Sequence, residues 1–114
     1  MNDHKIKLLL RKFAKDRDWD QFHSLKNLVC ALSVEASELL EIFQWIDIAD
    51  KKVNDKVIKQ KISEEVADIM LYLIRFADKA DINLEEVCLK KIQKNSKKYP
   101  VKLSKGTSKK YNEL

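Results

Sequence analysis

Residues 24–46 read SLKNLVCALSVEASELLEIFQWI, and this stretch decides the fold that we expect. Apolar side chains recur in it every three or four residues, which is the period of an amphipathic α-helix. The main apolar stripe consists of Leu25, Leu28, Val29, Leu32, Ala36, Leu39, Phe43 and Ile46. Because Ser24 is a residue type that caps helix N-termini, we expect one helix over residues 24–46.

The same stretch carries a second apolar group on another side of the helix. Its members are Ala31, Val34, Ile42 and Trp45. A helix that is apolar on two sides needs more than one partner to cover it. The pattern therefore indicates an oligomer or a deep cleft.

The helical period predicts three further helices, one before this stretch and two after it. They cover residues 3–16, 54–79 and 83–99, with a polar connector at 47–54. Asn83 and Glu86 have the spacing of a capping box, and Pro100 disfavours a helical residue before it. The chain has one Gly and one Pro, whereas a β-rich fold uses many of both in its turns. We expect an all-α fold with a four-helix core that is completed by oligomerisation.

Charge divides the chain into an acidic body and a basic end. The net charge is +5, and residues 88–114 carry nine Lys against Glu113, or +8, which leaves 5 − 8 = −3 for residues 1–87. We assign residues 1–100 to one domain and residues 101–114 to a basic C-terminal tail. Such a tail either keeps a protein soluble or binds phosphate groups.

Neither a membrane nor a secretory route is expected. No apolar run approaches the roughly 20 residues that cross a bilayer. The N-terminus MNDHKIKLLLRKFAKD is charged and lacks a signal-peptide cleavage site. Cys30 and Cys88 are isolated, as buried thiols of a reducing compartment are. We expect a cytoplasmic protein.

Two pairs of acidic residues stand out on the central helices. Glu35 and Glu38 are three residues apart, as are Glu65 and Asp68, and each pair borders the apolar stripe of its helix. If the stripes pack together, four carboxylates gather at one rim and repel one another. A hard cation would relieve that repulsion, and ligands that are all oxygens select Mg²⁺, Mn²⁺ or Ca²⁺ rather than zinc.

The residues alone leave other interpretations open. Acidic pairs also occur as solvated residues on helix surfaces. A di-iron centre uses Glu-x-x-His motifs, but neither His4 nor His23 follows a glutamate by three. The basic end leaves room for a non-enzymatic helical module that binds nucleic acid or a protein partner.

Several motifs, taken in order, resemble one known family. They are RDWDQFH at 17–23, Glu35-Ala-Ser-Glu38, ELLEIFQW at 38–45, Glu65-Val-Ala-Asp68 within EEVADIMLYL, and KYP at 98–100. Together they resemble the MazG-like all-α nucleotide pyrophosphohydrolases, with the dCTP pyrophosphatases closest in pattern, over residues 8–111.

This resemblance implies hydrolysis of a nucleoside triphosphate, dCTP or a 5-modified relative, to its monophosphate and pyrophosphate. It implies that Glu35, Glu38, Glu65 and Asp68 bind Mg²⁺, with Glu38 and Glu35 as candidate catalytic residues. The candidates for base binding are Trp19, Phe22, His23, Asn27 and Trp45. The candidates for phosphate binding are Lys91, Asn95, Lys98, Tyr99, Lys109, Lys110 and Tyr111. A homodimer or homotetramer is expected, and nucleic acid is not an expected partner.

Overall fold

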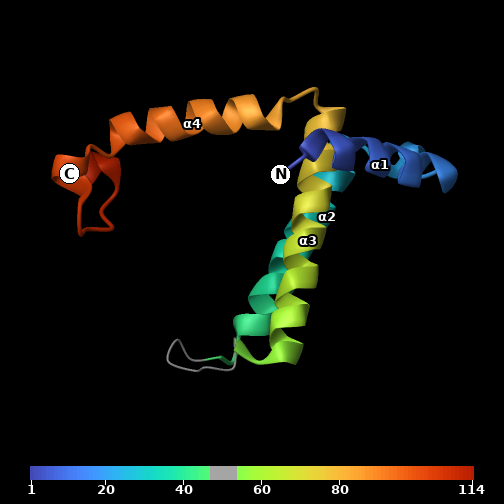
Figure 1. The fold of residues 1–114 in the computed structure, drawn as a ribbon, viewed down its shortest axis with the longest axis horizontal. Coiled ribbons are helices and arrows are strands. Elements are labelled where there is room, and N and C mark those ends of the chain that lie inside the picture. The colour runs from blue at the N-terminus through green and yellow to red at the C-terminus, as the bar shows by residue number, and fades with distance from the viewer. Residues whose placement is uncertain (47–53) are drawn as a thin grey trace. The chain divides into compact units, whose positions relative to one another are not determined.

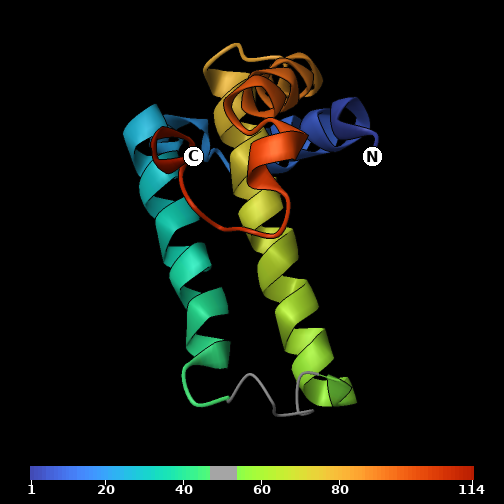
Figure 2. The same ribbon diagram turned by 90° about the vertical axis from the view of Figure 1, so that its left-hand side faces the viewer.

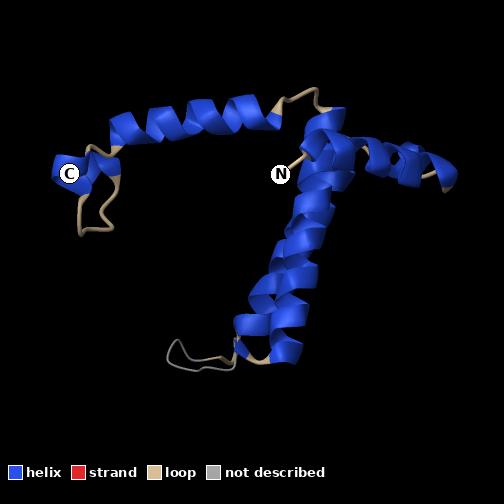
Figure 3. Ribbon diagram, in the orientation of Figure 1, coloured by secondary structure: helices blue, strands red, loops and turns tan. Residues whose placement is uncertain are grey.

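The computed structural model describes residues 1–46 and 54–114, and it is all-helical as expected. Its elements are α1 (Asp3–Asp16), η1 (Asp20–Phe22), α2 (Leu25–Phe43), α3 (Lys56–Lys79), α4 (Leu84–Lys98), α5 (Val101–Ser104) and η3 (Tyr111–Glu113). Figures 1 and 3 show these helices, and the described residues contain no strand. Apart from Asn54, the expected connector at 47–54 lies outside the described residues.

Side-chain caps set the starts of the helices. The Ser24 side chain accepts from the backbone N–H of Asn27, and the Asn83 side chain accepts from that of Glu86, which confirms both expected caps. Asp55 caps α3 through its own carboxylate, so this helix begins at Lys56 rather than at residue 54. Each cap satisfies backbone donors that would otherwise lack a partner.

Two helices end earlier than the sequence predicted. α2 ends at Phe43 instead of Ile46, because Gln44 and Ile46 each bond the carbonyl three residues back, at 3.2 Å, and so form tight turns. The apolar period continues through these turns, which is why the pattern overran the helix. α4 ends at Lys98, one residue early, because Tyr99 precedes Pro100.

Residues 1–81 form one compact unit in which α2 and α3 lie side by side and antiparallel (Figure 2). Its buried apolar side chains come from three helices: Ala14 on α1, Leu28 on α2, and Ile74 and Ala77 on α3. The core is small. Leu25 and Val29 belong to the main stripe of α2, yet they remain 45% and 46% exposed.

Residues 82–114 form a second compact unit. Within it the expected tail returns to the end of α4. The ring of Tyr111 meets that of Tyr99 edge-on, with centroids 6.3 Å apart, and Lys98 Nζ lies 4.8 Å from the Tyr111 ring. The tail thus has an ordered contact of its own. In the described part of the chain, no helix combines the length and apolarity that a bilayer crossing requires.

Candidate functional site

Three carboxylates converge between α2 and α3. Glu35 and Glu38 come from α2 and Glu65 comes from α3, and one oxygen from each lies within 4.8 Å of the others. Opposite ligands of Mg²⁺ are about 4.2 Å apart, because each bond is about 2.1 Å long. The three oxygens are therefore spaced closely enough to bind one small cation with little adjustment.

The surroundings of these carboxylates favour a cluster with a bound cation over a cluster of unpaired anions. The Oε2 atoms of Glu35 and Glu65 are shielded from solvent and have no hydrogen-bond partner in the described structure. Burial and the neighbouring acids raise the pKa of Glu35 to about 7. Burial, together with Glu38 and Asp68, also raises the pKa of Glu65. Buried oxygens without donors are costly, and a hard cation would satisfy them. The donor set thus fits Mg²⁺.

Asp68 lies near this cluster but outside its tightest part. It is not among the three oxygens within 4.8 Å, although its charge acts on both Glu35 and Glu65. Instead, its side chain lines an adjacent cavity. Asp68 therefore connects the carboxylate cluster to that cavity.

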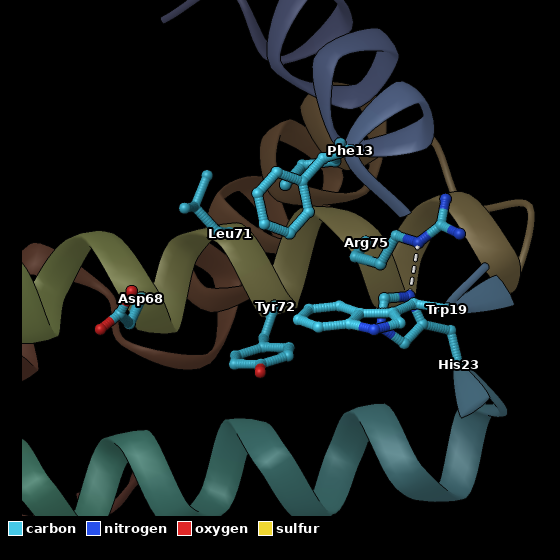
Figure 4. A pocket seen from close by; sticks show the side chains of 8 residues that line it. Phe13, Trp19, His23, Asp68, Leu71, Tyr72 and Arg75 are labelled. Atoms are coloured by element: carbon cyan, nitrogen blue, oxygen red, sulfur yellow. Dashed lines mark hydrogen bonds between the residues drawn. The ribbon is translucent and has the colours of Figure 1, made fainter. Parts of the chain in front are cut away.

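The cavity is aromatic and has a volume of about 140 Å³. Its walls consist of Leu10, Phe13, Trp19, His23, Asp68, Leu71, Tyr72 and Arg75. Figure 4 shows Asp68 at one end and His23 with Arg75 at the other. A cavity of about 150 Å³ in another protein binds benzene, so this space admits a six-membered heterocycle. The Trp19 indole meets Phe13 and His23 edge-on, at 5.7 and 6.4 Å, which supports its orientation.

A charged network holds one end of this cavity. Arg75 Nε donates to His23 Nδ1 at 3.1 Å, and the Arg75 guanidinium also pairs with Asp20 and with Asp78. Arg11 donates twice to Asp78, at 2.7 and 2.8 Å. These bonds connect α1, the segment after α1, and α3.

Sequence reasoning missed Arg75, Tyr72 and Phe13 as lining residues of this cavity. A signal was present for Arg75, since it is the single charge in the apolar run IMLYLIRFA of residues 69–77. Such a residue on an apolar face is usually buried with partners. Phe13 and Tyr72 gave no signal, because their spacing matches ordinary core residues.

The expected base-binding residues separate into two groups. Trp19 and His23 line the cavity, whereas Phe22, Asn27 and Trp45 are not among its lining residues. Asn27 donates from its side chain to the Phe22 carbonyl at 2.9 Å, and so it supports the loop. Trp45 follows the end of α2 and is 87% exposed.

The expected phosphate-binding residues all belong to the unit of residues 82–114: Lys91, Asn95, Lys98, Tyr99, Lys109, Lys110 and Tyr111. Of these, the structure brings together Lys98, Tyr99 and Tyr111.

The fold and the site define an all-α protein with a carboxylate cluster beside an aromatic cavity. The profile of the MazG-like family matches residues 30–114, which are 85 of the 114 residues. The chain belongs to the MazG-like family. The predicted resemblance is thereby confirmed.

Individual relatives are similar over most of this chain. It is 37% identical to dCTP pyrophosphatase 1 of Rattus norvegicus and 35% identical to that of Homo sapiens, each over 111 residues. These matches cover 96% of this chain but only 65% of each relative, so the chain spans less than two thirds of their length. The crystal structure of a pyrophosphatase from Archaeoglobus fulgidus DSM 4304 superposes with a TM-score of 0.79 at 38% identity, over 85% of this chain and 91% of that one.

Proposed function

We propose that this protein is a Mg²⁺-dependent nucleoside triphosphate pyrophosphohydrolase that converts dCTP, or a related 5-modified dNTP, to its monophosphate and pyrophosphate. The observation that carries the proposal is the carboxylate cluster of Glu35, Glu38 and Glu65 directly beside an aromatic cavity. The relatives named dCTP pyrophosphatase 1 support the substrate class.

In this proposal Glu35, Glu38, Glu65 and Asp68 hold the metal. When bound, Mg²⁺ polarises phosphoryl oxygens and offsets their negative charge. Mn²⁺ substitutes for it, since both ions prefer oxygen ligands. Glu38 is the exposed member of the cluster, so it can accept a proton from an approaching water. Glu35 assists catalysis by keeping the metal and its oxygen ligands in position.

The nucleobase enters the aromatic cavity between Trp19 and His23, with Phe22 and Asn27 supporting the loop. Trp45 follows the opposite end of α2, about 30 Å from His23 at 1.5 Å per residue, so it would cover the base from a second copy of the chain. Lys91, Asn95, Lys98 and Tyr99 bind the phosphates, and Lys109, Lys110 and Tyr111 close over them. This set supplies the positive charge that a triphosphate needs beside a group of acids.

We also propose that a second copy of the chain completes the fold, as a homodimer or homotetramer. The small core supports this, together with exposed apolar side chains such as Val34 at 56%, Leu40 at 71% and Ile92 at 62%. A second copy of the chain would remove part of this apolar surface from water, which is favourable. Sedimentation of the purified protein should give at least a dimer, and a monomer at micromolar concentration would contradict the proposal.

The decisive experiment is an assay of pyrophosphate and monophosphate release from each dNTP and from 5-methyl-dCTP, in Mg²⁺ or in EDTA. We expect release from dCTP in Mg²⁺ that is lost in EDTA and in Glu38→Gln. Glu85→Gln removes the same charge from an exposed position in the first turn of α4, outside the cluster, and should retain activity. Folded protein that hydrolyses no nucleotide in Mg²⁺ or Mn²⁺ would overturn the proposal.

A further inference from the structure

Arg75 occupies an unusual position for an arginine. It lies on α3 between the buried residues Ile74 and Ala77, and only 5% of it is exposed. A buried charge is costly unless it is paired and hydrogen-bonded. The buried guanidinium of Arg75 therefore needs its hydrogen-bond and ion-pair partners to stay in place.

Because the other N–H groups of Arg75 face carboxylates, its Nε–H is left with one acceptor, which is His23. The far end of the guanidinium meets Asp20 and Asp78. Asp78 is itself held by Arg11 from α1, and Asp20 lies 3.4 Å from Lys79. With both carboxylates anchored, Nε points at His23 Nδ1, 3.1 Å away, as the dashed line in Figure 4 indicates.

This contact determines where His23 carries its proton. An arginine side chain has five N–H donors and no acceptor, and it does not lose its charge in proteins. His23 Nδ1 must therefore accept, which places the single proton of the neutral ring on Nε2. Burial lowers the pKa of His23, and the charge of Arg75 lowers it further, so the neutral ring is favoured.

The remaining polar atom of the ring is then a donor at a cavity wall. His23 lines the aromatic cavity, and among the described residues no hydrogen bond uses its Nε2. Trp19 and Arg75 line the same end of the cavity, where the Arg75 guanidinium is engaged by His23, Asp20 and Asp78. A ligand ring in this cavity would lie beside three side chains that can donate a hydrogen bond: His23 through Nε2, Trp19 through its indole N–H and Tyr72 through its hydroxyl.

We propose that Arg75 is a positioning residue that holds His23 as the Nε2–H tautomer, so that His23 donates a hydrogen bond to an acceptor on the pyrimidine edge of the substrate. The acceptor is a ring carbonyl oxygen or an unprotonated ring nitrogen, both of which cytosine presents. This inference rests on the proposed function for its substrate, but the tautomer itself does not depend on catalysis.

The first test is the tautomer, read from long-range ¹H–¹⁵N correlations of the imidazole rings at pH 8. The chain has two histidines, and exposed His4 serves as an internal reference. We expect His23 with an unprotonated Nδ1 and a protonated Nε2, whereas His4 shows the mixture of a solvated ring. Arg75→Met should give His23 a mixture as well. A wild-type His23 that carries its proton on Nδ1 would overturn the inference without any variant.

The second test separates this role from simple support of the fold. Arg75→Met should raise the KM for dCTP about 5- to 10-fold, the effect of about one hydrogen bond, with a smaller change in kcat. Arg75→Lys should restore part of the loss. Lys79→Met removes the neighbouring cation of Asp20 but not the bond to His23, and it should leave both the KM and the tautomer unchanged.

A double-mutant comparison completes the test. In a His23→Ala background, Arg75→Met should raise the KM by less than about 2-fold, because the two residues act through one hydrogen bond. Additive effects would mean that Arg75 acts without His23, and would overturn the inference. If the wild type hydrolyses no nucleotide, the proposed function fails while the NMR result still decides the tautomer.

Discussion

The carboxylate cluster and the Arg75 network use similar charged side chains to opposite effect. At the cluster, Glu35, Glu38 and Glu65 meet one another with no ion pair to a described residue, and the pKa of Glu35 rises to about 7. In the network, the hydrogen bond from Arg11 lowers the pKa of Asp78. Partial burial works against ionisation of Asp20, but Arg75 and Lys79 still lower its pKa.

The comparison shows what distinguishes a binding site from a structural network. The Arg75 network is complete within the chain, so it stabilises the joint between α1, the loop and α3. The cluster is incomplete by itself, because among the described residues no ion pair reaches Glu35, Glu38 or Glu65. Carboxylates that repel one another without counter-charges lower the stability of the fold and favour the binding of a cation. Breaking each region should therefore produce different kinds of loss.

The largest effect should follow from breaking the cluster. We expect Glu35→Gln to lower kcat/KM for dCTP more than about 100-fold, beyond the 10- to 100-fold typical of groups that only support metal ligands. Since one repelling charge is removed, Tm in EDTA should not fall. Thermal unfolding beside the activity assay checks both. A Glu35→Gln enzyme of normal activity, with Glu85→Gln as control, would remove Glu35 from the metal site.

Removing an aromatic side chain from the cavity wall should have the next largest effect, on the KM for dCTP. Stacking on an aromatic side chain is worth about 1–3 kcal/mol per base, so Trp19→Ala should raise the KM for dCTP about 10-fold or more. Trp45→Ala sharpens the comparison, because Trp45 is 87% exposed and outside the cavity walls. A KM effect as large for Trp45→Ala would place that residue over the base. No effect of Trp19→Ala would mean that the base binds elsewhere.

The metal-free protein should lose stability as the pH rises. The folded-state pKa of Glu35 is about 7, above its ordinary value of 4.5. Between these values the unfolded chain releases this proton first, so the free energy of unfolding falls with increasing pH. Urea unfolding at pH 5 and pH 8 in EDTA measures the change, and the difference from Glu35→Gln isolates this group. Mg²⁺ should restore stability at pH 8. If the wild type and Glu35→Gln respond identically to pH, Glu35 is not perturbed.

The smallest effect should come from the edge of the Arg75 network. The Asp78 side chain is 10% exposed, whereas Arg11 is 52% exposed, so solvent screens part of their attraction. We expect Asp78→Asn to lower Tm by about 4–8 °C, the shift that about 1 kcal/mol produces in a small domain. Asp16→Asn breaks an exposed pair with Lys12 and should leave Tm unchanged. Equal shifts in the two variants would mean that the network adds nothing beyond surface charge.

Much of the fold was predictable from local patterns. The period of the apolar residues located all four long helices, and Ser24 and Asn83 marked two of their starts. The end of α2 was predicted wrongly, because apolar periodicity continues into a tight turn. Periodicity reports which side of a segment is covered, but not the hydrogen-bond pattern of its last residues.

The sequence by itself determined an all-α chain with two acidic pairs beside apolar stripes, because helical spacing depends only on the order of the residues. Only the tertiary structure decided which groups meet. It separated Asp68 from the tightest cluster and set it in the cavity wall, and it joined Arg75 to His23 across 52 residues. Contacts between distant segments depend on how helices pack, and no local period contains that information.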